Sequence, residues 1–83
     1  MTLTLRYFAW VRERVGEPSE MIETGAETVG ALVEELRGRE PRYARAFADL
    51  RAVRVAVDQE VADLESPIGG AREVAFFPPM TGG

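Results

Sequence analysis

The pattern that most constrains the fold is one long apolar helical stripe, set between short segments in which polar and apolar residues alternate. The stripe has the spacing i, i+3, i+4 and i+7, and it consists of Val29, Leu32, Val33 and Leu36. Thr28 suits the N-cap of this helix, and Gly38 is expected to end it. A single helix of this kind can cover one face of a sheet but not both.

The alternating segments predict the strands of that sheet. Residues 2–8 place Leu3, Leu5 and Tyr7 on one face and the residues between them on the other. Strands are also predicted at residues 20–24, after a turn signal at Pro18 and Ser19, and at residues 53–57, 61–65 and 72–77. Apolar residues four apart predict shorter helical segments at residues 10–16 and 41–50. This order is that of an α+β, ubiquitin-like β-grasp. In that fold the sheet is mixed, the first and last strands are parallel neighbours at its centre, and one main helix crosses one face.

The length of 83 residues allows one domain, and no cysteine is present to staple it. We expect residues 1–77 to form the β-grasp domain and residues 78–83 a flexible tail that ends in Gly-Gly. No stretch has the 18 or more apolar residues, roughly, of a membrane span, and no signal peptide is visible. A cytoplasmic protein that contacts no membrane is therefore the expectation.

Composition argues against several kinds of site. The net charge is −4, and the sequence lacks the cluster of basic residues that a nucleic-acid-binding protein uses to contact phosphates. The chain has no histidine, cysteine or lysine to activate a nucleophile, and its carboxylates are scattered rather than spaced as metal ligands. We therefore expect no metal site, no cofactor held by the chain, and no catalysis by the chain alone.

Alternation also predicts an apolar patch on the face that the helix leaves uncovered. Phe8 and Phe77 fall near the ends of two adjacent strands on that face, and Val61 could join them. Contiguous apolar surface of this kind marks interfaces, so these three residues are predicted to bind a partner. The alternative is that a loop of the same chain covers the two phenylalanines.

The C-terminal sequence FFPPMTGG combines a rigid exit with a slender end. Pro78 and Pro79 end the hydrogen-bond ladder and favour an extended path. Gly82 and Gly83 have no side chains and can thread a narrow channel. The residues predicted to enter a partner with this tail are Pro78, Pro79, Met80, Thr81 and Gly82, and the reactive group is the carboxylate of Gly83.

The stretches FAWVRE, EVAFFPP and FFPPMTGG resemble the small subunit of molybdopterin synthase, a β-grasp sulfur carrier of about this length. The resemblance implies that an E1-like enzyme adenylates Gly83 with ATP and that a sulfur donor then converts it to a thiocarboxylate. It also implies that the tail enters the large synthase subunit, in a heterotetramer, and gives sulfur to a pyranopterin precursor. Phe8, Val61 and Phe77 match the apolar contact of the family, whereas Met80 and Trp10 depart from its usual residues.

Three alternatives remain open at this point. The chain could carry sulfur for thiamine or for tRNA thiolation, because those carriers also end in Gly-Gly. It could be a ubiquitin-like modifier, whose terminal glycine is joined to a lysine of another protein. It could also be a structural interaction module whose Gly-Gly end has no chemical role.

Overall fold

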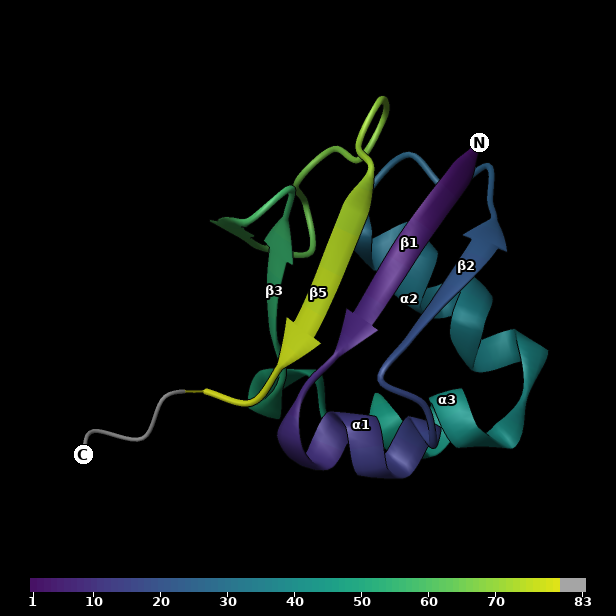
Figure 1. Cartoon of the computed structure of the whole chain (residues 1–83), viewed down its shortest axis with the longest axis vertical. Helices are drawn as coiled ribbons and strands as arrows, with labels where there is room; N and C mark the ends of the chain where they lie inside the picture. Colours follow the sequence, from purple (N-terminus) through teal and green to yellow (C-terminus); the bar gives the residue numbers. More distant parts are fainter. Residues whose placement is uncertain (80–83) are drawn as a thin grey trace.

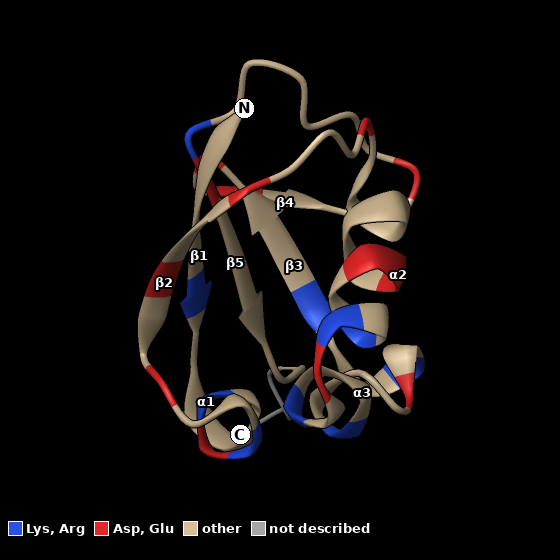
Figure 2. Ribbon diagram, turned by 90° about the vertical axis from the view of Figure 1, so that its right-hand side faces the viewer, with Lys and Arg blue, Asp and Glu red and all other residues tan. Residues whose placement is uncertain are grey.

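A computed structural model describes residues 1–79 as a five-stranded mixed sheet with helices on one face (Figures 1 and 2). The strand order is β2-β1-β5-β3-β4. The central pair, β1 and β5, is parallel, and the other neighbours are antiparallel, as the β-grasp prediction requires. The strands are β1 (Thr2–Tyr7), β2 (Ser19–Glu23), β3 (Arg54–Val57), β4 (Glu60–Ala62) and β5 (Glu73–Phe77).

The helices cover one face of the sheet and one of its ends. Figure 2 shows α2 and α3 beside one face of the sheet, and α1 at the end where β1 and β5 finish. The helical segments are α1 (Ala9–Val15), α2 (Val29–Arg39), α3 (Pro41–Ala46) and the 3₁₀ turn η1 (Leu50–Ala52). The predicted segments are all present, with ends that differ by up to a few residues.

The helix ends show which local signals determine the chain path. The Thr28 hydroxyl accepts a hydrogen bond from the Ala31 N–H at 3.1 Å, which confirms the predicted N-cap. Gly16 adopts a φ of +98° after α1, a conformation that favours glycine, and its N–H donates to the Arg12 carbonyl. The prediction that Gly38 ends α2 is wrong, because the helix continues to Arg39. Pro41 sets the end instead, since a residue before proline is disfavoured in the helical region.

The core lies between the helices and the inner face of the sheet. Phe76 of β5 is 1% exposed, and its ring centroid lies 4.8 Å from that of Phe47 and 6.1 Å from that of Tyr7. The stripe of α2 belongs to the same core cluster, with all four residues buried as predicted. Trp10 is partly buried against the core and its ring lies under the Arg14 guanidinium. One layer of helices thus excludes water from one sheet face.

A polar cluster around Glu20 fastens α3 to β2. The hydroxyls of Tyr7 and Tyr43 each donate to the Glu20 carboxylate at 2.7 Å, and Arg42 lies 3.3 Å from the same carboxylate. Burial raises the pKa of the Tyr7 hydroxyl well above its usual value, and the hydrogen bond to Glu20 adds to that rise. The pKa of Tyr43 rises for the same two reasons.

The loop before β5 closes the far end of the domain. The N–H groups of Val29 and Gly30 donate to the carbonyls of Ser66 and Leu64, which satisfies two free donors at the start of α2. This contact is close, because a Cβ atom on Gly30 would lie 3.0 Å from the Leu64 carbonyl oxygen.

Candidate functional site

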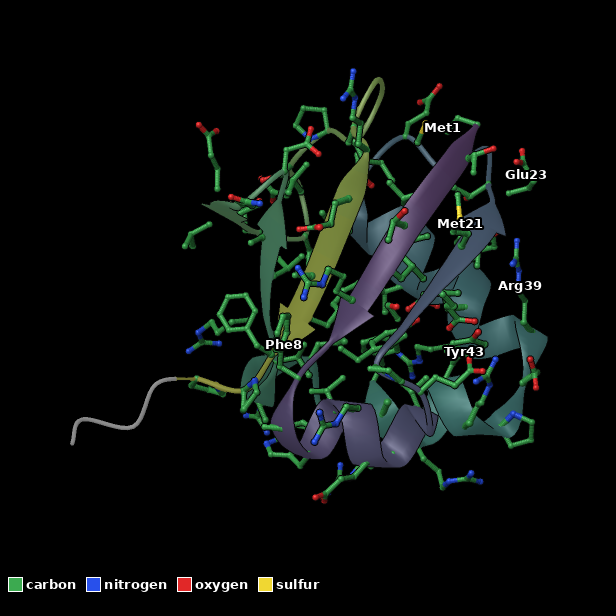
Figure 3. The ribbon with its side chains drawn as sticks, viewed as in Figure 1. Met1, Phe8, Met21, Glu23, Arg39 and Tyr43 are labelled. Atoms are coloured by element: carbon green, nitrogen blue, oxygen red, sulfur yellow. The ribbon has the colours of Figure 1, made fainter. Side chains whose placement is uncertain are left out.

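The outer face of the sheet carries the apolar patch that the alternation predicted. Phe8 follows β1 directly, and its N–H donates to the Phe76 carbonyl at 3.1 Å, so its backbone is held beside β5 (Figure 3). Phe8 keeps 41% of its surface exposed, and Val61 keeps 82%. Phe77 is half-buried. The loops within residues 1–79 leave Phe8 accessible, which argues against the alternative that the chain covers it.

A strained turn follows Phe8, whose own backbone is extended, with a φ of −128° and a ψ of 153°, so its side chain continues the alternation of β1. Ala9 has a φ of +50°, which is uncommon for a residue with a side chain and costs about 1–2 kcal/mol. This backbone turns the chain at once from β1 into α1, which runs across the end of the sheet (Figure 1). Strain of this kind is tolerated where the surrounding structure fixes it, and it gathers at functional sites.

A groove with a volume of about 630 Å³ lies between the two phenylalanines and the proline exit. Its apolar wall is formed by Phe8, Ala75, Phe77, Pro78 and Pro79, and its remaining lining by Arg6, Ala9, Gln59 and Glu73. The structure therefore brings four of the predicted partner-binding residues together around one cavity. Their role in binding a partner stays a prediction.

Val61 belongs to the same face but not to the groove lining. It lies opposite Ala56, which lies opposite Ala75 of the groove. Both alanines are only 8% exposed, although they are on the outer face. The two alanines therefore add little accessible surface between the groove and the edge strand β4, where the Val61 side chain is largely exposed.

One ion pair lies along the groove. The Arg6 guanidinium is 3.7 Å from the Glu73 carboxylate, and it also lies 5.3 Å from the centre of the Phe8 ring. The pair is partly exposed, so it contributes little to the stability of the fold. Together with Gln59 it gives a polar side to a groove whose remaining lining is apolar, a composition typical of binding sites.

The alternation of the strands could have identified the polar residues of the groove. Arg6 has the same parity as Phe8, and Glu73 has the same parity as Phe77, so each pair shares a sheet face. Arg54 does not line the groove but lies opposite Phe77, because of the β3–β5 register, which the sequence alone does not reveal.

The predictions for Met80, Thr81, Gly82 and Gly83 concern residues outside the described range. The division into a domain of residues 1–77 and a tail of residues 78–83 also stays a prediction.

Within residues 1–79, no three acidic side chains lie close enough together to hold a metal ion. None of the helices described has the length and apolar character that a membrane crossing requires.

The ThiS family matches residues 5–83, which is nearly the whole chain. The chain belongs to the ThiS family. It is 38% identical over 77 residues to the molybdopterin synthase sulfur carrier subunit of Escherichia coli, covering 93% of this chain and 94% of that protein. The resemblance identified from FAWVRE and the C-terminal sequence is thereby confirmed.

Solved structures confirm the ubiquitin-like β-grasp fold of this ThiS-family chain. SAMP1 of Haloferax volcanii, a small archaeal modifier protein, has a TM-score of 0.76 and 27% identity over 100% of both chains. A chain from the complex of subunits 1 and 2 of the Helicobacter pylori molybdopterin-converting factor has a TM-score of 0.65. At 22% identity over 100% of both chains, this second likeness shows the fold.

Proposed function

We propose that this chain is the sulfur carrier of a molybdopterin synthase. The observation that carries the proposal is the apolar groove of Phe8, Phe77, Pro78 and Pro79, which lies immediately before a Gly-Gly terminus. Supporting it, a relative with 38% identity is named as the sulfur carrier subunit of molybdopterin synthase. An interface at the base of a slender terminus is what a protein needs in order to present its last carboxylate inside a partner.

The proposed chemistry takes place on the carboxylate of Gly83. An E1-like enzyme would join this carboxylate to the α-phosphorus of ATP, forming an acyl-adenylate and releasing pyrophosphate. A donor of sulfide-level sulfur would then supply the atom that displaces AMP, so that a C–S bond replaces the C–O bond to phosphate and a thiocarboxylate results. Within the large synthase subunit the thiocarboxylate sulfur would bond to the pyranopterin precursor, and water would then cleave the acyl–sulfur bond, which leaves the sulfur on the precursor and returns Gly83 to a carboxylate. The chain itself would bind no cofactor in these steps, because ATP is used by the activating enzyme.

The proposed assembly is a heterotetramer with the large subunit, located in the cytoplasm. The subunit complex of the Helicobacter pylori molybdopterin-converting factor supports a binary contact of this kind. The apolar groove and the exposed Val61 would form the contact surface on this chain. Burial of Phe8 against a partner would remove its exposed surface from water and favour the complex.

The second candidate is a protein modifier, because the similar SAMP1 chain is called a small archaeal modifier protein. In that case Gly83 would form an isopeptide bond with a lysine of another protein. A carrier for thiamine or tRNA thiolation remains a third possibility, because its terminal chemistry would be the same up to the acceptor.

Mass spectrometry of the native C-terminal peptide separates these functions. We expect a fraction of the protein to carry sulfur in place of one oxygen on Gly83. A Gly83–lysine isopeptide without any thiocarboxylate would instead support the modifier. A strain without the gene, scored for molybdoenzyme activity, then separates the sulfur carriers from one another. Activity restored by the full chain but not by a chain lacking Gly82 and Gly83 would support our proposal.

A further inference from the structure

The charged side chains of this protein are divided between its two ends. Arginines without a carboxylate partner within residues 1–79 gather where β1 and β5 finish, as Figure 2 shows on α1, α3 and the start of β3. These arginines are Arg12, Arg14, Arg45 and Arg54. At the other end, exposed carboxylates that form no ion pair within residues 1–79 lie on the loops: Glu27, Asp58, Asp63 and Glu65, with Glu60 at the start of β4. Glu13 and Arg72 are the exceptions to this division.

This division runs against the overall charge of the chain. The net charge is −4, with 14 carboxylates against 10 arginines, so carboxylates are in excess. Four of the arginines at the end that leads into the C-terminus nevertheless lack carboxylate partners among the residues the structure describes, whereas Arg42 at the same end is shared by Glu17, Glu20 and Glu40. Unpaired positive charge therefore gathers at one end of the protein and unpaired negative charge at the other, so an acidic partner would be attracted to the first end and repelled by the second.

Arg54 lies at the point where this positive end meets the groove. It is opposite Phe77 in the β3–β5 register, and Phe77 is the last residue before the proline exit. The Arg54 Nη1 donates to the Arg51 carbonyl at 3.0 Å, so the guanidinium is held by the backbone rather than by a carboxylate. An arginine fixed in this way retains N–H donors that suit the planar oxygens of a carboxylate.

Arg51 adds a second, more exposed positive charge next to Arg54. Its side chain is 93% exposed, and the contact with Asp49 at 3.3 Å joins two exposed groups that are two residues apart. Such a pair is worth little and gives way readily to a better partner. Arg54, which lies opposite Phe77 of the groove, and Arg51, whose carbonyl accepts from Arg54, together form a basic margin.

We propose that this basic margin docks against a carboxylate-rich surface of the large synthase subunit, around the opening that takes the C-terminus. This inference rests on the proposed function and names the chemistry of the surface that receives the chain. The apolar groove supplies contact area. The unpaired arginines are attracted to the carboxylates of the partner and so orient the domain with the end that leads into Gly83 toward it. Charges at the margin of an interface act mainly on the association rate and on its dependence on salt.

The test is the association rate constant of the full chain with the large subunit from the same organism. Arg54→Glu and Arg72→Glu change the net charge equally, but Arg72 lies before β5 at the acidic end. We expect Arg54→Glu to slow association about tenfold at low salt and Arg72→Glu to change it by less than about twofold. The difference should nearly vanish near 1 M salt, where the screening length is only about 3 Å.

A second variant protects the test from a folding defect. Arg51→Glu changes a side chain that is almost entirely in water, so it should fold normally and slow association in the same direction. Equal rates for Arg54→Glu and Arg72→Glu would overturn the inference, and so would a loss confined to the ATP-dependent activating enzyme. Failure of the unmodified chain to bind the large subunit would instead overturn the proposed function on which the inference rests.

Discussion

Phe76 and Phe77 are consecutive residues in the same strand, yet they belong to two different parts of the molecule. Phe76 is 1% exposed and packs between Tyr7 and Phe47. Phe77 faces the opposite side, is half-buried, and lines the groove before Pro78. The two faces of the sheet therefore use the same residue type for two purposes. One face holds the fold together and the other stays available, and the following experiments test this separation.

The largest effect is expected on the inner face. Phe76→Ala removes a ring that is fully packed and leaves a cavity, so the free energy of unfolding should fall by about 3–5 kcal/mol. This is a large share of the stability of a small domain. Urea denaturation followed by circular dichroism measures the change. The matched variant Phe77→Ala should lose much less, and an equal loss would show that the two faces are not energetically distinct.

Substitutions on the outer face should lower the affinity for the partner rather than the stability of the fold. Phe8→Ser should weaken binding to the large subunit by about 2 kcal/mol or more, roughly thirtyfold in Kd, because central aromatic residues dominate interfaces. Calorimetric titration gives the affinity, and thermal denaturation of the same variant gives the stability. Met21→Ser is the control. Met21 is 71% exposed on the same face, but it lies on the edge strand β2, away from the groove (Figure 3).

Two results would count against this division of labour. If Phe8→Ser lowered only the stability and left the affinity unchanged, the exposed ring would be part of the fold and not of an interface. If Met21→Ser weakened binding as strongly as Phe8→Ser, the contact surface would extend over the whole outer face rather than over the groove.

The sequence predicted the separation of the two faces but not its details. Alternation assigns Phe76 and Phe77 to opposite faces because side chains in a strand point to alternate sides. It could not reveal that Arg54 lies opposite Phe77, because register depends on how distant strands pair. The turn at Ala9, with a φ of +50°, also has no local signal, because alanine ordinarily favours a regular helix.

Helix ends show the same limit. Thr28 was a correct N-cap prediction because its hydroxyl acts on an N–H three residues away. Gly38 was a wrong prediction of a C-terminus, since a glycine only permits a helix to end. Pro41 disfavours continuation at the residue before it, so it determines the boundary more strongly. Signals that act within one turn were predictable, whereas contacts between distant segments were not.

A smaller effect is expected where the helix layer meets the loop before β5. Gly30→Ala should lower the free energy of unfolding by about 1–3 kcal/mol, because the new methyl group would lie 3.0 Å from the Leu64 carbonyl. Gly38→Ala in the same helix meets nothing within 4 Å and should raise stability by up to about 1 kcal/mol. Opposite signs in chemical denaturation would confirm that close packing, not helix propensity, selects glycine at position 30. Equal gains for both variants would contradict it.

The smallest effect concerns Tyr7, whose ring is on the inner face while its hydroxyl reaches the Glu20 cluster. The folded state holds the pKa of Tyr7 above its unfolded value of about 10, so this contribution is complete below about pH 10 and is lost as the pH rises further. Tyr7→Phe should cost about 1 kcal/mol at neutral pH through the lost hydrogen bond to Glu20. Its stability should also decline less steeply above about pH 10, because one of the two tyrosines with a raised pKa is gone.

Urea denaturation of both proteins between about pH 8 and pH 11 measures the two slopes, and arginine stays charged throughout this range. Tyr43→Phe is the matched control, since Tyr43 donates to the same carboxylate and its pKa is raised for the same reasons. If stability fell with pH equally steeply in Tyr7→Phe and in the unmodified chain, Tyr7 would have the same pKa in the folded and the unfolded state. The inner face would then admit water at the Glu20 cluster, and the contrast between the two faces would hold only for the aromatic core around Phe76.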